Sequence, residues 1–207
     1  MKPIVMIRGL CQWINVAIII LFACSLIFAQ RPSHRVVCII KTEIGDIQVE
    51  VDVARAPLTA NNFLRYVDGK YYDGGQFHRT VRLDNQPNNK ILIEVVQASI
   101  NPERVKDEFP SIKLETTKET GLQHKNGTIS MARAKPDTAT SQFFICINDQ
   151  PEEDYGGKRN PDGQGFAAFG RVIKGMDVVR RIQSAHAEGQ KLTPPIKILE
   201  IRRKSRK

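Results

Sequence analysis

Two adjacent phenylalanines inside a short apolar run limit the ways in which this chain can fold. Phe143 and Phe144 lie in the run 141–147, which is typical of a β-strand. Successive side chains of a strand point to opposite faces, so one ring can fill a core while the other faces outward. The preceding run, 127–134, has small residues along one side, which leaves space for a ligand. The sequence therefore predicts two strands with a groove on their outer face.

Short runs with the signals of β-strands continue along most of the chain. In the clearest one, residues 47–53, isoleucine and valines alternate with polar residues, which indicates a half-buried strand. Further strands are predicted at 36–41, 76–81, 91–97, 165–173 and 194–203. Closure of the sheet hides the edges of so many strands, so the sequence predicts a mainly β fold.

Two segments have the pattern of helices. Residues 57–67 open with Pro57, which favours a helix start, and their apolar face comprises Ala60, Phe63, Leu64 and Val67. Residues 175–182 predict a second helix. Segments 82–90 and 149–164 are polar and predict surface loops, whereas the weakly patterned segment 101–120 predicts a long, partly strand-like excursion.

The first 29 residues differ from the rest and predict a targeting segment. Lys2 and Arg8 precede the apolar run 14–28, and Ala29 follows it, as in a secretory signal that is cleaved after a small residue. Two alternatives remain open: an uncleaved membrane anchor, for which the run falls short of the roughly 20 apolar residues of a span, and lipidation at Cys24. Cleavage predicts an exported protein, either periplasmic or secreted. The sequence further predicts that residues 30–35 form a linker and that residues 36–203 form one domain.

The charge balance and the cysteines exclude several kinds of site. Removal of Lys2 and Arg8 lowers the formal net charge from +9 to +7, and residues 204–207 form a basic tail. Such a tail can bind nucleic acid or an acidic membrane face, but export makes nucleic acid an unexpected partner. Cys38 and Cys146 are expected as buried thiols, with a disulfide as the alternative in an oxidising compartment. Neither cysteine has the spacing of a metal or redox site.

A series of motifs, in order across residues 36–203, resembles the cyclophilin family of peptidyl-prolyl isomerases. The resemblance implies a closed eight-stranded antiparallel β-barrel capped by two α-helices, with the groove on its outer surface. The motifs are Pro-Leu-Thr-Ala-Asn-Asn-Phe at 57–63, Phe-His-Arg at 77–79, Gln97, Ser-Met-Ala-Arg-Ala at 130–134, Ser-Gln-Phe-Phe-Ile at 141–145, and Phe-Ala-Ala-Phe-Gly-Arg-Val at 166–172.

The reaction of that family suits these residue types. Rotation about an amide bond costs ~18–20 kcal/mol because the nitrogen lone pair is delocalised, and an X-Pro bond interconverts slowly. A catalyst needs a seat for the proline ring and a hydrogen-bond donor that favours the twisted amide. It needs no nucleophile, metal or cofactor. A guanidinium donates without changing protonation, and the resemblance assigns that role to Arg79, assisted by Gln97.

The resemblance also implies a set of substrate-binding residues. Phe144 would form the wall of the proline pocket, with Phe166 and Val95 beside it. His78 belongs to the same motif as Arg79 and is expected to be structural rather than an acid–base group. The residues that would hydrogen-bond or flank the part of the substrate before the proline are Ala132, Arg133, Ala134 and Gln142.

Several positions depart from the family pattern and weaken the predicted pocket. Glu94-Val95 replaces a Phe-Met pair, and Glu152-Glu153 stands where an aromatic-Leu pair is usual, unless Tyr155 fills the gap.

Two functions therefore remain. The first is an isomerase that speeds folding of exported, proline-containing polypeptides, acting as a monomer. The alternative is a catalytically weak or inactive proline-peptide-binding module, a holdase or adaptor, on the same fold.

Overall fold

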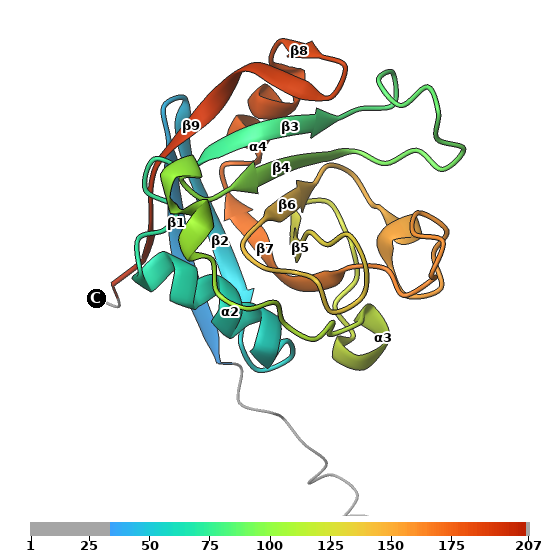
Figure 1. Cartoon of the computed structure of the whole chain (residues 1–207), viewed down its shortest axis with the longest axis horizontal. Helices are drawn as coiled ribbons and strands as arrows, with labels where there is room; N and C mark the ends of the chain where they lie inside the picture. The colour runs from blue at the N-terminus through green and yellow to red at the C-terminus, as the bar shows by residue number, and fades with distance from the viewer. Residues whose placement is uncertain (1–33, 206–207) are drawn as a thin grey trace, which may run out of the picture. The chain divides into compact units, whose positions relative to one another are not determined.

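The computed structural model describes residues 34–205 (Figure 1). The predicted signal segment and its cleavage site lie outside the described residues, as do the last two residues of the basic tail. The predicted linker 30–35 ends one residue too late, because Arg35 begins strand β1 and pairs with Asp52 of strand β2. Within the described residues, no helix is both long and apolar enough to span a bilayer.

The described residues form one antiparallel sheet of nine strands, eight of which close into a barrel. The order is β1-β2-β7-β5-β6-β4-β3-β9-β8, and an additional pairing between β1 and β9 closes the barrel. The ninth strand, β8, pairs only with β9 and stays outside. The strands are β1 Arg35–Thr42, β2 Gly45–Asp52, β3 Gln76–Val81, β4 Val95–Ser99, β5 Thr128–Met131, β6 Phe143–Cys146, β7 Ala167–Lys174, β8 Ala187–Glu188 and β9 Lys191–Arg203. The predicted closed eight-stranded barrel is confirmed.

Two helices pack against the barrel, as predicted. Helix α2 spans Pro57–Asp68 and buries the predicted apolar face, while helix α4 spans Met176–Ser184. The N-cap residue Ala56 has no side-chain acceptor, and Glu115 from a distant loop instead accepts hydrogen bonds from the backbone N–H of Leu58 and Thr59 at 3.0 and 2.7 Å. This distant cap satisfies donors that a helix start leaves unpaired.

The prediction of a partly strand-like excursion at 101–120 was largely wrong. The segment holds a 3₁₀ helix, η1 at Pro102–Asp107, and the short helix α3 at Thr117–Thr120. Its strand pairing is limited to one isolated bridge between Ile112 and Ala139. Local capping explains the difference, because the Asn101 side chain accepts from the backbone of η1 and Thr116 forms a capping box with Glu119.

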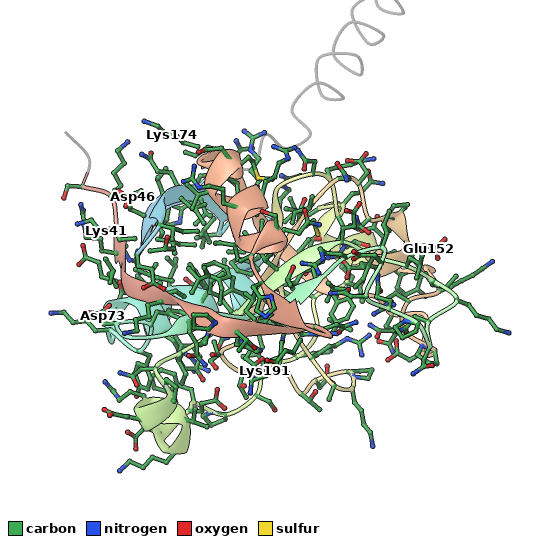
Figure 2. All side chains as sticks on the ribbon, turned by 90° about the horizontal axis from the view of Figure 1, so that it is seen from above. Lys41, Asp46, Asp73, Glu152, Lys174 and Lys191 are labelled. Carbon is green, nitrogen blue, oxygen red and sulfur yellow. The ribbon has the colours of Figure 1, made fainter. Side chains whose placement is uncertain are left out.

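Apolar side chains gather in two clusters, one on each side of the barrel wall. The interior cluster includes Phe143 and Phe63, whose rings meet edge to face at 5.5 Å. The outer cluster contains Phe144 with Val81, Ile93, Val95 and Cys146, and Ala132 and Phe166 pack against it. The two adjacent phenylalanines therefore face opposite sides, as the strand pattern predicted. The charged residues labelled in Figure 2, such as Lys41, Lys174 and Glu152, lie at the periphery.

The two cysteines of the domain lie on opposite sides of the wall. Cys38 belongs to the interior cluster and Cys146 to the outer one, and both thiols are free and buried. The alternative of a disulfide between them was therefore wrong, and buried thiols were the correct expectation.

Strand β3 contains a bulge that changes the direction of its side chains. Phe77 pairs with Ala98 of β4, and Arg79 pairs with the next residue, Gln97, so His78 is the extra residue. Strict alternation would place Phe77 and Arg79 on the same face, but one additional residue moves the following side chain to the other face. Phe77 therefore points into the barrel, and Arg79 points outward beside Gln97.

The interior cluster predicts a large difference between two positions of α2. Phe63 is fully buried against Tyr72, Phe143 and Phe169, with ring centroids 5.2–5.5 Å apart. We expect Phe63→Ala to lower the free energy of unfolding by ~3–5 kcal/mol because it leaves a cavity. Urea unfolding followed by circular dichroism measures this. The control Leu58→Ala, at a side chain that is 51% exposed, should cost less than ~0.5 kcal/mol; equal losses would contradict the assignment of the core.

Candidate active site

A pocket of about 230 Å³ opens on the outer face of the barrel wall, where β3, β4 and β6 lie side by side. Most of the predicted site residues line it: Arg79, Val95, Gln97, Ala132, Arg133, Phe144 and Phe166. Ile93, Glu153, Arg159 and Asn160 also line it and were not predicted as site residues. His78, Ala134 and Gln142 were predicted but are not among the lining residues.

Arg79 is held in place by neutral amide groups on both sides. Its Nε and Nη2 donate to Oε1 of Gln190 at 3.0 and 2.7 Å, and its Nη1 donates to Oε1 of Gln97 at 2.8 Å. Gln97 in turn donates from Nε2 to Oε1 of Gln142 at 2.7 Å. Burial, and then the charge of Arg159, lower the pKa of Arg79, but a guanidinium stays protonated in proteins. The result is a fixed cation at the edge of the pocket.

Gln190 is a site residue that the sequence did not reveal. It lies between β8 and β9, and its Nε2 donates to the backbone oxygen of Asn85 at 3.1 Å. It precedes the predicted final strand at 194–203 and belongs to no predicted element. No motif marks Gln190, because its contact with Arg79 depends on how the hairpin folds back over β3.

The apolar wall consists of two rings that meet edge to face. The centroids of Phe144 and Phe166 are 5.2 Å apart, with an angle of 83° between the rings. Such aromatic pairs are favourable beyond the area that they bury. The wall continues through Ile93, whose backbone N–H and oxygen both bond to the side chain of the buried Gln86. The inserted loop 82–90, predicted as polar surface, thus positions a part of the pocket.

A buried polar chain supports Phe144 from behind. The imidazole of His124 stacks on the Phe144 ring at 6.0 Å and 13°. Its Nδ1 lies 2.7 Å from Oδ1 of Asp154, and its Nε2 lies 2.9 Å from Oγ of Ser130. The order Ser-His-Asp is that of a hydrolase relay, but Ser130 is fully buried and does not line the pocket. The chain therefore fixes the ring and offers no nucleophile to a ligand.

Arg133 forms part of the pocket wall. Its guanidinium donates to both carboxylate oxygens of Asp162, at 2.8 and 2.9 Å, and to the backbone oxygen of Gly165. It also lies 5.3 Å from the centroid of Phe166, and its side chain is 1% exposed. The sequence placed Arg133 beside the substrate, and the structure shows it tying the loop before β7 to the aromatic wall.

The three predicted residues outside the lining differ in their positions. His78 is half-buried at the bulge, its Nδ1 is buried without a hydrogen-bond partner among the described residues, and burial lowers its pKa. The structural role expected for His78 stays a prediction. Ala134 is exposed on the loop after β5. Gln142 is exposed and reaches the site through its contact with Gln97.

Glu94 and Glu152 stand at positions where the resemblance implies an apolar pocket wall, and neither residue lines the pocket. The Glu94 carboxylate accepts from Asn148 and Gln183 and is not among the lining residues. Glu152 accepts from the backbone N–H of Lys158 and does not line the pocket either. Tyr155 is 46% exposed beside Lys118 and does not fill the gap. Neither residue therefore brings its carboxylate into the pocket, and the weakening expected from the loss of apolar wall at these positions stays a prediction.

Glu153 alone brings a carboxyl group into the pocket. Its side chain is 1% exposed, and the Sγ of Cys146 donates to its Oε2 at 3.5 Å. Burial raises the pKa of Glu153 to about 8, so the group is mainly neutral at pH 7. The sequence placed Glu153 near the pocket, but its burial could not be predicted from a run of polar residues.

Arg159 links the two loops that flank the pocket. Its Nη1 donates to the backbone oxygen of Ile91 at 2.6 Å, and its own N–H donates to the backbone oxygen of Glu152 at 3.0 Å. The segment 149–164 was predicted as a polar surface loop, and this prediction missed Arg159. One signal was present: the loop lies close in sequence to Phe166, a predicted wall residue.

The raised pKa of Glu153 predicts how stability depends on pH. Between about pH 4.5 and 8 the folded chain keeps a proton that the unfolded chain has lost, so the free energy of unfolding should fall as pH rises through this window. We expect the free energy of unfolding of the Glu153→Gln variant not to fall in this window. At pH 8 it should exceed the free energy of unfolding of the parent protein by about 2 kcal/mol or more, since one pKa unit corresponds to about 1.4 kcal/mol.

Urea unfolding at pH 5, 6.5 and 8 measures the effect. The control Glu103→Gln removes a carboxyl group from an exposed position on η1 and should follow the parent protein. Parallel pH profiles of the parent and Glu153→Gln would show that Glu153 titrates normally.

Comparisons with known proteins agree on one family. The family model described as cyclophilin type peptidyl-prolyl cis-trans isomerase/CLD matches residues 37–203. A peptidyl-prolyl cis-trans isomerase of Acinetobacter baylyi is 34% identical over 171 residues, covering 80% of this chain and 84% of the relative. Peptidyl-prolyl cis-trans isomerase A of Dickeya dadantii is 34% identical over 174 residues, covering 84% and 83%.

The solved structures agree in fold. A cyclophilin type peptidyl-prolyl cis-trans isomerase of Cryptosporidium parvum superimposes with a TM-score of 0.67 at 21% identity, covering 84% of this chain and 100% of that chain. A second crystal structure of that protein, in the presence of the dipeptide Ala-Pro, gives a TM-score of 0.65 at 22% identity, covering 82% and 99%. With the sequence match over almost the whole barrel, these findings show that the chain belongs to the cyclophilin-type peptidyl-prolyl cis-trans isomerases.

Proposed function

We propose that this cyclophilin-type chain isomerises X-Pro bonds with Arg79 as the catalytic group. The observation that carries the proposal is the position of the Arg79 guanidinium, fixed between Gln97 and Gln190, on the same pocket as Phe144 and Phe166. In the twisted amide the prolyl nitrogen becomes pyramidal and is a better hydrogen-bond acceptor. A donor placed in advance stabilises that state more than the planar ground state, which lowers the barrier.

Gln97 and Gln190 fix the orientation of the Arg79 guanidinium. Each amide oxygen accepts from the guanidinium, so the plane of Arg79 is defined before a substrate arrives. A preorganised donor does not have to reorient during the reaction. Gln97 and Gln190 are therefore positioning residues for the proposed catalytic group. The proposed reaction leaves every protonation state unchanged.

Proline-containing polypeptides are the proposed partners of the pocket. Phe144, Phe166, Ile93 and Val95 supply apolar surface for a pyrrolidine ring. The Cryptosporidium parvum relative has been crystallised in the presence of Ala-Pro, a dipeptide with the same ring. On this proposal Ala132, which lines the pocket, and Gln142, which contacts Gln97, flank the residues before the proline. The chain would act as a monomer.

The second candidate is a proline-peptide-binding module with little or no activity. The presence of Glu153 and Arg159 in the pocket favours it, because polar groups replace apolar wall that would hold the ring. The two candidates share the groove and differ in the rate of isomerisation. A binder would retain affinity for X-Pro peptides without accelerating their interconversion.

We also propose that the substrates are exported proteins that are still folding. The N-terminal sequence, with Lys2 and Arg8 before an apolar run and Ala29, supports export through a cleaved signal. Folding chains in that compartment carry X-Pro bonds in both isomers, and their slow exchange limits folding. An uncleaved segment would instead attach the same domain to a membrane.

Loss of the Arg79 side chain tests the catalytic role. We expect Arg79→Ala to lower kcat/KM at least ~100-fold, the usual cost of one aimed donor, with an unchanged circular dichroism spectrum. Exchange of an Ala-Pro peptide followed by NMR, without a coupled protease, gives the rate. The control Arg180→Ala removes the same charge from an exposed position on α4 and should keep the parental rate. A parental rate in Arg79→Ala would exclude this mechanism.

The mass of the mature protein tests export. When the full chain is expressed in a bacterial host, the product in the extracellular or periplasmic fraction should begin at Gln30. Leu21→Arg interrupts the apolar run and should leave an uncleaved precursor inside the cell. Recovery of the parent protein in the membrane fraction with Met1 still attached would favour the anchor.

A further inference from the structure

Two guanidinium groups of the pocket, those of Arg79 and Arg159, are not paired with a carboxylate among the described residues. Every hydrogen bond that the Arg79 side chain makes within residues 34–205 goes to the amide oxygen of a glutamine. The side chain of Arg159 donates to one backbone oxygen, that of Ile91. In the part of the chain that the structure describes, neither guanidinium forms a salt bridge, although both line the same pocket.

The other charged groups of the pocket do not change this balance. Arg133 also lines it, but its guanidinium is paired with both carboxylate oxygens of Asp162. Glu153 is the one acidic residue among the lining residues, and its carboxyl group contacts the thiol of Cys146 and forms no salt bridge within the described residues. Burial raises its pKa to about 8, although the nearby charges of Arg159 and Arg79 act to lower that pKa. The charge of Arg159 lowers the pKa of Arg79, which indicates that the two guanidinium groups lie close enough to repel each other.

A ligand in this pocket therefore meets uncompensated positive charge beside the apolar wall. Arg159 keeps Nε and Nη2 without a hydrogen-bond partner among the described residues, whereas its Nη1 is used by the loop. A guanidinium with spare donors binds carboxylates well. Charge complementarity of this kind decides between similar ligands more than it adds raw affinity.

We infer that the site selects X-Pro segments that carry an acidic side chain next to the proline, and that Arg159 is the residue that sets this preference. The inference rests on the proposed function, because it assumes that the proline ring occupies the wall formed by Phe144 and Phe166. Arg159 lines the same pocket as Phe144 and Phe166, so a residue next to the ring would carry its side chain toward this guanidinium. An aspartate or glutamate supplies the missing negative charge, and a lysine at that place is repelled.

The test compares short peptides that differ only in one residue beside the proline. Three peptides carry Asp, Asn or Lys before it, and three carry the same residues after it. At pH 7 and low salt, kcat/KM for the better Asp peptide should exceed that of its Asn counterpart by about threefold or more, the effect of a partly exposed ion pair, and the Lys peptide should be the slowest. The Asp/Asn ratio should approach one in 0.5 M NaCl, because salt screens the pair.

Two variants assign the preference to Arg159. Arg159→Gln should bring the Asp/Asn ratio close to one, and Arg159→Lys, which keeps the charge, should restore most of it. The ratio is the readout, so a general change of rate in either variant does not affect the conclusion. Arg180→Gln, at an exposed position of α4 outside the pocket, should keep both the parental rate and the parental ratio.

The failure of this inference is distinct from a failure of the proposed function. Isomerisation of all peptides at similar rates, or an Asp preference that survives in Arg159→Gln, would overturn the role of Arg159 and leave the isomerase intact. If no peptide is isomerised, the same six peptides are compared by fluorescence binding. A tighter Asp peptide would then support a charge-selective binding module, and equal or absent binding would overturn the inference.

Discussion

One extra residue in strand β3 determines on which face of the barrel wall Arg79, the proposed catalytic group, lies. The interior of the barrel is filled by aromatic and aliphatic side chains, so it has no room for a ligand. A site must therefore be on the outer face of the wall, and an uninterrupted β3 would send Arg79 to the inside together with Phe77. The bulge at His78 reverses the direction of the strand's side chains at that point. It brings Arg79 opposite Gln97, and the rest of the site is arranged around this pair.

Strand β6, which forms part of the pocket wall, is packed on both of its faces and therefore holds the pocket residues in fixed positions. Phe143 and the other interior rings fix β6 from inside, while the stacked His124 and its two partners fix Phe144 from outside. Backbone pairing connects the two layers, so the pocket wall cannot shift without disturbing the core. A rigid support of this kind suits a reaction in which the protein contributes only shape and one aimed charge.

The sequence predicted the features that depend on local periodicity. Alternation placed Phe143 and Phe144 on opposite faces, and spacing identified the buried face of α2. Family motifs identified Arg79, Gln97 and Phe144, which share one pocket. The missed features depend on distant contacts. Gln190 acts through a hairpin that folds back, and Glu153 and Arg159 come from a polar stretch whose burial depends on its contacts with residues such as Ile91 and Phe166.

In the hairpin of β8 and β9, the pairing that closes the barrel and the contact that orients Arg79 are made by different residues. The barrel closes through the pairing of β1 with β9, and β8 takes no part in that closure. Gln190, at the turn of this hairpin, nevertheless holds one side of the Arg79 guanidinium. The orientation of the proposed catalytic cation is thus set in part by a turn that lies outside the eight strands of the closed barrel. On the proposed mechanism, a substitution of Gln190 would change the rate of isomerisation without removing any pairing that closes the barrel.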